Sequence, residues 1–354
     1  MPRSLRQIVA AIATATFVLG TAAPAVLAHG LVPAPPSLPG TLLAWSFDPT
    51  VVVPLALAAV LYVAAVRSVD RAHPATPVPR VRTAAFLAGL VTIEIALQSP
   101  IEHYDTTLFS FHMLQHMLLM FFAAPLLALG APITLLLRAA RPELRTRFVL
   151  PVLHSRVVRV VSFPVVTWIT FAAVMWGTHF SPWFDLALED PLVHQLEHAA
   201  FLAAALLFWW PVVGLDPSPW RMPYPVRALY TFLQMPQNTF LSLAIFSAGE
   251  PLYEHYATLE RTWGPTPLSD QQAAGALMWV GGDMVFIVAL VLVVMAWMRA
   301  EDRSAAATDA RIEREEAAID ARARSLSERA AAAHEAAAHE ATAGYGSGEA
   351  SSSR

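Results

Sequence analysis

Residues 107–137 read TLFSFHMLQHMLLMFFAAPLLALGAPITLLL, a run without any Asp, Glu, Lys or Arg. A helix needs about 20 mainly apolar residues to cross a bilayer, so this run predicts a membrane helix. It is too long for one straight span. We expect Pro125 and the Gly130-Ala131-Pro132 sequence to kink or break it, because proline removes a backbone donor from a helix.

Comparable apolar segments lie on both sides of this run. At the N-terminus, the apolar segment Leu5–Ala28 begins beside Arg3 and Arg6 and ends in small residues. This pattern is typical of a secretory signal peptide, and a retained signal anchor is the alternative. Because backbone groups in lipid must be satisfied within the chain, we expect an all-α polytopic membrane helix bundle with seven transmembrane helices after this signal peptide or signal anchor. The predicted spans lie near residues 50–66, 83–98, 107–137, 160–178, 192–213, 227–248 and 270–298.

The sequence therefore divides into three parts. Residues 1–28 are the signal peptide or signal anchor, residues 29–299 the seven-span membrane domain, and residues 300–354 a tail rich in Ala, Arg and Glu. The interleaved charges of the tail predict a solvated helix to about Ala341, followed by a disordered Gly/Ser end.

Composition excludes several classes of protein. Of the 354 residues, 56% are hydrophobic and 14% are charged, whereas a soluble domain averages about 45–50% and about 25%, so a soluble enzyme is disfavoured. The absence of Cys removes disulfides and Cys-based metal sites. The near-zero net charge of the membrane domain argues against a nucleic-acid partner, which would need a concentrated basic face.

Arginines occupy alternate loops between the predicted spans. The intervening loops are acidic, and Arg261 is their sole cation. By the positive-inside rule, the arginine-rich loops are cytoplasmic, the N-terminus lies outside after signal cleavage, and the tail lies inside. The arginines in question are Arg67, Arg71, Arg80, Arg82, Arg138, Arg141, Arg145, Arg147, Arg156, Arg159, Arg221, Arg227 and Arg299.

Histidines carry the clearest chemical signal. Four of them form two pairs of equal spacing, His112-Met-Leu-Gln-His116 and His194-Gln-Leu-Glu-His198. Residues four apart share one helix face, so each pair can bind one metal ion, and two facing pairs could supply four nitrogens. Neutral imidazole suits copper, zinc, iron and nickel. A single histidine is more simply explained by a hydrogen bond between helices, but two pairs at one depth favour a metal or cofactor site.

Other residues are weaker candidates. His179 ends the fourth predicted span and His103 lies in an outer loop, so both could assist. Met117 offers a thioether, which favours cuprous copper over zinc, although methionine also fills gaps in apolar packing. Asp283 interrupts the seventh span, where a lone carboxylate needs a partner. The predicted metal ligands are His112, His116, His194, His198, His179, His103, Met117 and Asp283.

Several segments together resemble the CtaG family of cytochrome c oxidase assembly factors, over about residues 40–299. They are Ser99-Pro-Ile-Glu-His-Tyr-Asp105, Phe109-Ser-Phe-His-Met-Leu-Gln-His-Met117, Trp176-Gly-Thr-His-Phe-Ser-Pro-Trp-Phe184 ahead of the second histidine pair, Gln234-Met-Pro-Gln-Asn238, and Asp270-Gln-Gln with Gly281-Gly-Asp-Met284. The resemblance implies a multi-pass protein of the bacterial plasma membrane, in contact with membrane lipid, that matures a haem–copper oxidase at a copper-insertion step. An unrelated copper chaperone of the same name uses Cys, which this sequence lacks.

We expect a non-enzymatic assembly factor that holds copper on the histidine pairs near the outer face and passes it to a cytochrome c oxidase subunit. A copper transporter is an alternative, with Gln237, Asn238 and Asp283 along an inward path. An intramembrane zinc protease is less favoured, although His194-Gln-Leu-Glu197-His198 fits the inverted zinc-protease motif. A haem-binding membrane protein is the remaining alternative.

Overall fold

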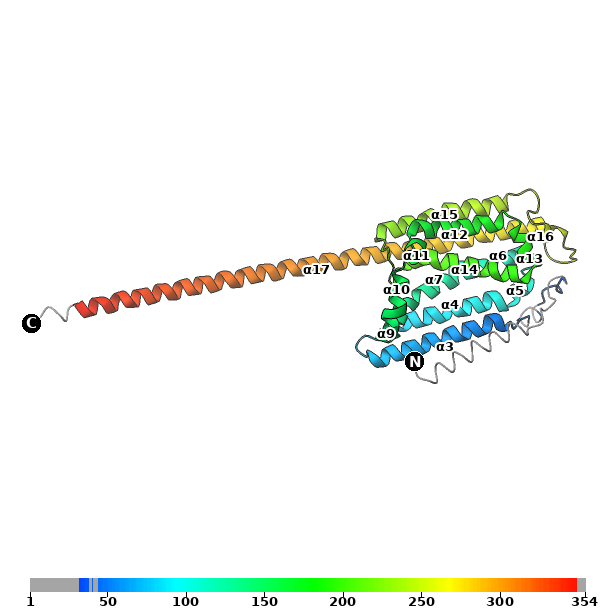
Figure 1. The fold of residues 1–354 in the computed structure, drawn as a ribbon. Helices are drawn as coiled ribbons and strands as arrows, with labels where there is room; N and C mark the ends of the chain where they lie inside the picture. The colour runs from blue at the N-terminus through cyan, green and yellow to red at the C-terminus, as the bar shows by residue number, and fades with distance from the viewer. Residues whose placement is uncertain (1–31, 38–39, 41–43, 349–354) are drawn as a thin grey trace, which may run out of the picture. The chain divides into compact units, whose positions relative to one another are not determined.

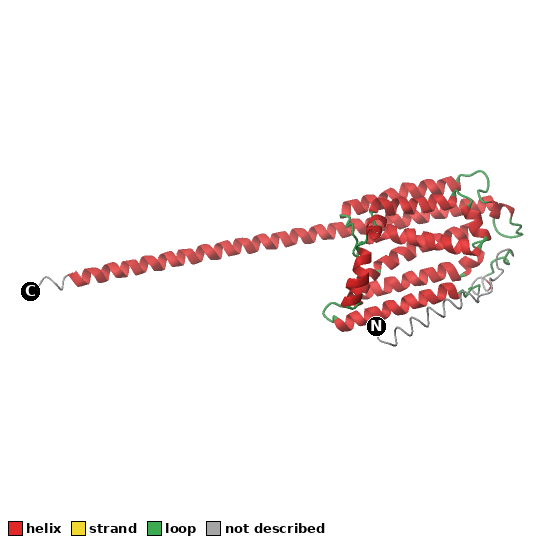
Figure 2. Cartoon of the chain, viewed as in Figure 1, coloured by secondary structure: helices red, strands yellow, loops and turns green. Residues whose placement is uncertain are grey.

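The computed structural model describes residues 32–37, 40 and 44–348 of the chain. Within these ranges the structure is helical and contains no β-strand (Figure 2), which agrees with the predicted all-α class. The expected signal peptide or anchor, residues 1–28, lies outside the described residues. The chain divides into two compact units, Met1–Val294 and Met295–Arg354, and each is described by itself.

The first unit contains long helices joined by short helical connections (Figure 1). In chain order these are α3 (Pro49–Ala72), α4 (Arg80–Gln98), α5 (Pro100–Tyr104), α6 (Phe109–Met117), the π-helix η1 (Leu118–Ala123), α7 (Ala124–Leu129), α8 (Pro132–Ala139), α9 (Pro142–Leu144), the π-helix η2 (Arg145–Val149), α10 (Leu150–Leu153), α11 (Arg156–Val161), α12 (Pro164–His179), α13 (Trp183–Glu189), α14 (Pro191–Val213), α15 (Tyr224–Phe246), α16 (Glu254–Thr258) and the beginning of α17 (Pro267–Gly348).

Five helical stretches of the described chain are long and apolar enough to cross a membrane, by length and composition. They are Pro49–Ala72, Arg80–Tyr104, Phe109–Ala139, Pro191–Val213 and Pro267–Ala336. Helices also lie where the other two predicted spans fall: α12 has 16 residues, and α15 contains Pro236 among polar side chains. The structure thus supports a membrane protein, and the number of seven spans stays a prediction.

The 107–137 run is interrupted where the sequence predicts. The π-helix η1 ends directly before the turn that carries Pro125, and the amide of Ala124 bonds to the carbonyl of Leu119, five residues back. A second break follows at Ala131, whose φ of 48° is left-handed. There the carbonyl of Gly130 accepts a hydrogen bond from the Tyr62 hydroxyl at 2.7 Å, and α8 begins at Pro132.

Helix α14 lies at the centre of the first unit. It packs against α7, η1, α12, α13 and α15, while α4 packs against α3, α7 and η1. Two buried apolar cores result: one contains Phe201 and Phe208 of α14, and the other contains Leu90 and Ile93 of α4. The run from α6 to α7 contributes to both cores, so its side chains are fixed on several sides.

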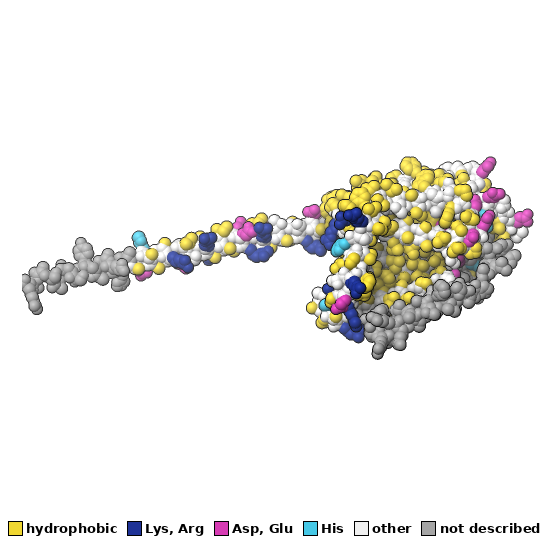
Figure 3. All heavy atoms as spheres, viewed as in Figure 1, with side chains coloured by type: hydrophobic (Ala, Val, Ile, Leu, Met, Phe, Trp, Pro, Cys, Tyr) yellow, Lys and Arg dark blue, Asp and Glu magenta, His cyan; other side chains and the backbone are white. Residues whose placement is uncertain are grey.

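Charge is unevenly distributed along the first unit. On the face drawn in Figure 3, dark blue arginine side chains gather at one end of the helices and magenta acidic side chains at the other. The arginine-rich end includes the short helices α9 to α11. This segregation is the one that the alternating loops predict.

The second unit consists of helix α17 beyond Val294. Its side chains through Ala336 are exposed almost throughout, and Arg311 pairs with Glu315 at 2.8 Å, one helical turn away. This part of α17 is therefore an exposed helix, and the nature of the tail as a separate solvated segment stays a prediction. The helix continues past Ala341, where the sequence predicts its end, to Gly348, and residues 349–354 lie outside the described residues.

Candidate metal centre

The two histidine pairs face each other across the interface of α6 and α14. Within each pair the ring centroids are 4.2 Å apart, as the spacing of four residues requires. Between the helices, the His112 and His194 rings are stacked with centroids 5.3 Å apart, and the His116 and His198 rings are 5.5 Å apart. All four side chains are buried. The structure thus brings the four predicted imidazoles to one place.

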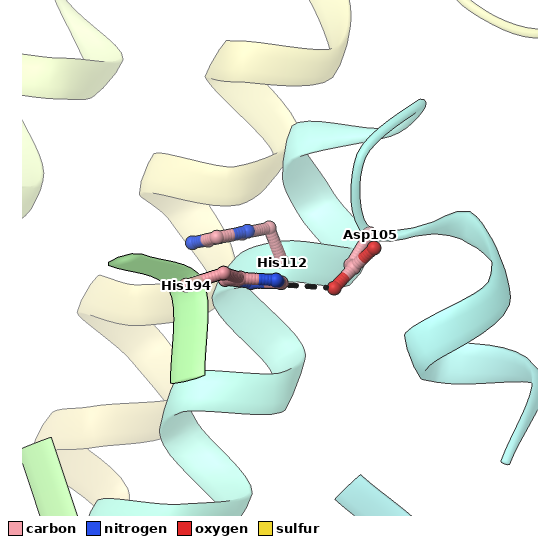
Figure 4. Close-up of side chains that lie close together, drawn as sticks. All are labelled: Asp105, His112 and His194. Atoms are coloured by element: carbon pink, nitrogen blue, oxygen red, sulfur yellow. Dashed lines mark ion pairs between the residues drawn. The ribbon is translucent and has the colours of Figure 1, made fainter. Parts of the chain in front are cut away.

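Two carboxylates complete this group. Oε2 of Glu197 lies 3.7 Å from Nε2 of His112 and 3.9 Å from Nε2 of His116. Oδ2 of Asp105 lies 3.5 Å from Nε2 of His194 (Figure 4). We call these six residues the histidine–carboxylate cluster: Asp105, His112, His116, His194, Glu197 and His198.

Polar atoms in the cluster are buried without hydrogen-bond partners. Both ring nitrogens of His112 and of His116 are in this state, as are both carboxylate oxygens of Glu197. Buried polar groups are nearly always hydrogen-bonded because an unmade bond costs about 1–3 kcal/mol. Such a concentration of lone-pair donors at one point fits a site that binds a cation.

Within the described residues, two groups of three side chains have metal-ligand spacing. One group is Asp105, His112 and His194, and the other is His112, His116 and Glu197; in each, one ligand atom per residue lies within 4.8 Å of the others. Metal–nitrogen and metal–oxygen bonds are about 2.0–2.2 Å, so ligand atoms 3.5–3.9 Å apart can reach a common ion. The ligands fit copper or zinc; neutral imidazoles and one carboxylate per group would balance a monovalent ion.

The loop that carries Asp105 is fixed by residues far away in the sequence. The backbone carbonyl of Asp105 accepts from the Tyr256 hydroxyl at 2.6 Å, and the carbonyl of Thr106 accepts from Nε2 of His255 at 2.8 Å. Arg261 donates to the carbonyl of Thr107 at 2.9 Å. Burial, and next the nearby Glu102, raise the pKa of Asp105 well above its usual range. A bound cation would replace the proton that this environment favours.

Helix α6 is held at its first residues by an acidic side chain of α17. Oδ2 of Asp270 accepts from the backbone amide of Phe109, and Oδ1 accepts from the hydroxyl of Ser110, both at 2.6 Å. The first amides of a helix have no partner within it, so a carboxylate here both caps α6 and fixes its position. His112 and His116 follow on the next turns.

Gln115 fixes the orientation of the His198 ring. Its Nε2 donates to the carbonyl of Ala96 at 3.0 Å and to the carboxylate of Glu102. Its Oε1 lies 2.9 Å from Nε2 of His198. Because an amide oxygen only accepts, Nε2 of His198 carries the proton and Nδ1 has the lone pair that could bind a metal.

His179 lies against Met113 of α6. Its Nδ1 is 2.7 Å from the carbonyl of Met175, and its Nε2 is 3.4 Å from Sδ of Met113. The ring also contacts Phe184 and Phe201, at centroid distances of 5.7 and 6.0 Å. His179 is therefore buried at the same end of the bundle, and its sulfur neighbour Met113 is not among the predicted ligands.

The other predicted ligands are placed elsewhere. His103 is exposed on α5, with its ring against Tyr104. Met117 packs α6 against α17, where its terminal methyl lies close to Gly281. Asp283 accepts from Nδ2 of Asn238 at 3.1 Å and from the hydroxyl of Thr239 at 2.6 Å. The partner that a carboxylate needs at this position is thus supplied by α15.

Glu197 and Asp105 are the two residues of the cluster that are not among the predicted ligands. Glu197 follows His194 by three residues, and this spacing could have placed it on the same helix face. Nothing local to Asp105 indicates its position, because contacts with residues 255, 256 and 261 determine it.

A family model described as cytochrome c oxidase caa3 assembly factor matches residues 60–300. The chain belongs to this family. The match includes all six residues of the histidine–carboxylate cluster and confirms the resemblance stated for the sequence.

Three curated relatives from mycobacteria carry the description uncharacterized protein. Those of Mycobacterium bovis and Mycobacterium tuberculosis are 30% identical over 285 residues, and that of Mycobacterium leprae is 30% identical over 286 residues. In each case the match covers 78% of this chain and 43% of the relative. The chain therefore spans less than half the length of the curated relatives it matches. No solved structure matches it.

Proposed function

We propose that this chain is a non-enzymatic membrane assembly factor that binds copper at the histidine–carboxylate cluster and delivers it to a cytochrome c oxidase subunit. The observation that carries the proposal is the gathering of four buried imidazoles and two carboxylates between α6, α14 and the Asp105 loop, where five of the six residues form two groups with metal-ligand spacing. The family description, cytochrome c oxidase caa3 assembly factor, supports the oxidase as the proposed recipient.

The chemistry of the cluster supports transfer rather than permanent structural binding. Structural metal sites are closed by four protein ligands, whereas each group here has three ligands and shares His112 with the other. A three-ligand site leaves a position open for a ligand of the recipient. By the arginine distribution, the cluster would lie at the outer face of the plasma membrane.

The first test is the metal content of the detergent-purified full chain. We expect copper close to one ion per chain or more, and a clear fall in the copper content when His112, His116, His194 and His198 are all changed to Ala. A matched control changes the exposed His73, His154 and His334 to Ala and should keep the copper. Absence of metal in the wild-type chain after loading with cuprous ion would contradict copper binding.

The same measurement separates the alternatives. Iron with a Soret band would indicate haem, and zinc would favour a protease that depends on Glu197. Uptake of copper into vesicles that contain the chain alone would indicate a transporter.

Delivery is tested in cells. Removing the chain should lower the copper content and activity of the oxidase, and the control variant should restore both while the four-histidine variant should not. Equal restoration by the two variants would show that the cluster has no part in oxidase maturation.

A further inference from the structure

His179 and Met113 present two lone pairs to each other inside the bundle. Nδ1 of His179 lies 2.7 Å from the carbonyl oxygen of Met175. A carbonyl oxygen can only accept, so the proton of the neutral imidazole must be on Nδ1. The other nitrogen, Nε2, is then an acceptor, and the atom 3.4 Å away from it is the thioether sulfur of Met113, which also has no hydrogen to donate.

Two facing acceptors are an unusual arrangement for a buried contact. The side chains of His179 and Met113 are 3% and 1% exposed, and the rings of Phe184 and Phe201 lie beside the imidazole. No hydrogen bond is made between the two atoms, so their position has to be explained by packing or by a cation that both of them bind.

The donor atoms select the class of cation. Thioether sulfur and imidazole nitrogen are soft or intermediate ligands that favour cuprous copper, whereas calcium and magnesium require oxygen. Metal–nitrogen and metal–sulfur bonds are about 2.0 and 2.3 Å. Their sum exceeds the observed 3.4 Å, so a single ion could contact both atoms with its remaining positions open.

The hydrogen bond from Nδ1 of His179 to the backbone carbonyl of Met175 is of the kind that metal-binding histidines make. Ligating histidines almost always donate their second ring nitrogen to a carbonyl or carboxylate, which fixes the tautomer and the ring orientation. The Nδ1 contact to Met175 does this here, and the hydroxyl of Thr178 lies 3.2 Å from the same nitrogen. The lone pair on Nε2 is thereby held toward Met113.

We propose that Met113 and His179 form a second cation site, specific for cuprous copper, beside the histidine–carboxylate cluster. Met113 follows His112 directly on α6, so the two sites adjoin. The assignment deepens the proposed function, on which it rests for copper as the cargo. Both ligands of this site are neutral, and the thioether is a soft ligand. A cuprous ion could therefore leave the site by ligand exchange, without a change of oxidation state.

X-ray absorption at the copper edge tests the site directly. The full chain in detergent is loaded anaerobically with cuprous ion and compared with Met113→Leu, which replaces the sulfur by an apolar side chain of similar volume. We expect sulfur scattering at about 2.3 Å in the wild-type chain and its loss in the variant, together with at least a tenfold weaker affinity for cuprous ion. Met222→Leu is the matched control, because Met222 is also buried but lies after α14, at the opposite end of that helix from His194.

Zinc serves as the internal check of folding. Zinc bound per chain should be equal in the wild-type, Met113→Leu and Met222→Leu proteins, since zinc would occupy the histidine–carboxylate cluster. If Met113→Leu does not fold, His179→Leu removes the other donor and should lose the same sulfur scattering.

The outcomes separate the two proposals. Copper bound without sulfur scattering, or an unchanged spectrum in Met113→Leu, would overturn the Met113–His179 site and leave the proposed function intact. Sulfur-ligated copper that persists when His112, His116, His194 and His198 are changed to Ala would support this site, and it would contradict the cluster only if the number of copper ions per chain is also unchanged. A wild-type chain that binds no copper would overturn both.

Discussion

Oε2 of Glu197, on α14, lies 3.7 Å from Nε2 of His112, on α6, and neither atom has a hydrogen-bond partner. Both side chains are 0% exposed. A carboxylate buried in this way is costly unless a cation or proton compensates it. The pair therefore indicates that binding of a cation and packing of α6 on α14 are coupled.

Removing the charge of Glu197 tests this coupling. Glu197→Gln keeps the shape of the side chain, so we expect the metal-free chain to be as stable as the wild type or more stable. Copper affinity should fall at least about tenfold, or about 1.4 kcal/mol. Competition with a cuprous chelator and the thermal midpoint measure the two effects. Glu189→Gln, an exposed site on α13, is the control, and equal affinity in both variants would contradict a role for Glu197.

Gln115 orients the ring of His198, and this role can be tested by substitution. Gln115→Leu removes the acceptor of the His198 Nε2 proton but no ligand of the cluster. We expect copper affinity to fall about 10–100-fold, as is usual when an outer partner of a metal-bound histidine is lost, with the number of ions per chain unchanged. An affinity equal to that of the wild type would show that His198 needs no orientation.

Asp270 holds the helix that carries the first histidine pair. Asp270→Ala leaves the Phe109 amide and the Ser110 hydroxyl without their acceptors, so we expect a loss of stability of about 1–2 kcal/mol. Asp270→Asn retains one acceptor oxygen and should lose less. The thermal midpoint in detergent measures both, and a midpoint that is the same in Asp270→Ala as in the wild type would contradict the capping role.

A substitution of Asp283 shows whether this carboxylate joins two helices or binds the metal. Its two hydrogen bonds join α17 to α15, and such bonds in membranes average about 0.6 kcal/mol each. We expect Asp283→Ala to lose about 1 kcal/mol of stability while it keeps the copper of the wild type. Asp302→Ala, in the exposed tail, controls for the change of charge. Loss of copper in Asp283→Ala alone would show that Asp283 is a ligand.

Local spacing was sufficient to predict the histidine pairs and the break of the 107–137 run. An interval of four residues fixes which helix face a side chain occupies, and proline fixes where the backbone bonding must change. Both are properties of a few consecutive residues, so a single sequence contains them.

The carboxylates and Met113 depend on contacts between distant segments. Asp105 reaches His194 because Tyr256 of α16 and Arg261 hold the backbone of residues 105–107, and Met113 of α6 reaches His179 of α12 across two distant segments. The sequence supplies the residue types but not these distances. Asp283 shows the same limit, since the sequence indicated that it needs a partner but not that Asn238 and Thr239 provide it.

The π-helix η1 changes the direction in which the side chains of this long helix point before and after it. A wide turn takes one residue more than an α turn, and each residue of an α-helix advances the direction of side chains by about 100°. The extra residue between Met117 and Ala124 therefore lets the first half of this long helix direct His112 and His116 toward α14, while Leu127 in the second half enters the core of α4. The helix face with His112 and His116 is thus rotated relative to the face with Leu127, and the one extra residue of the wide turn produces this rotation.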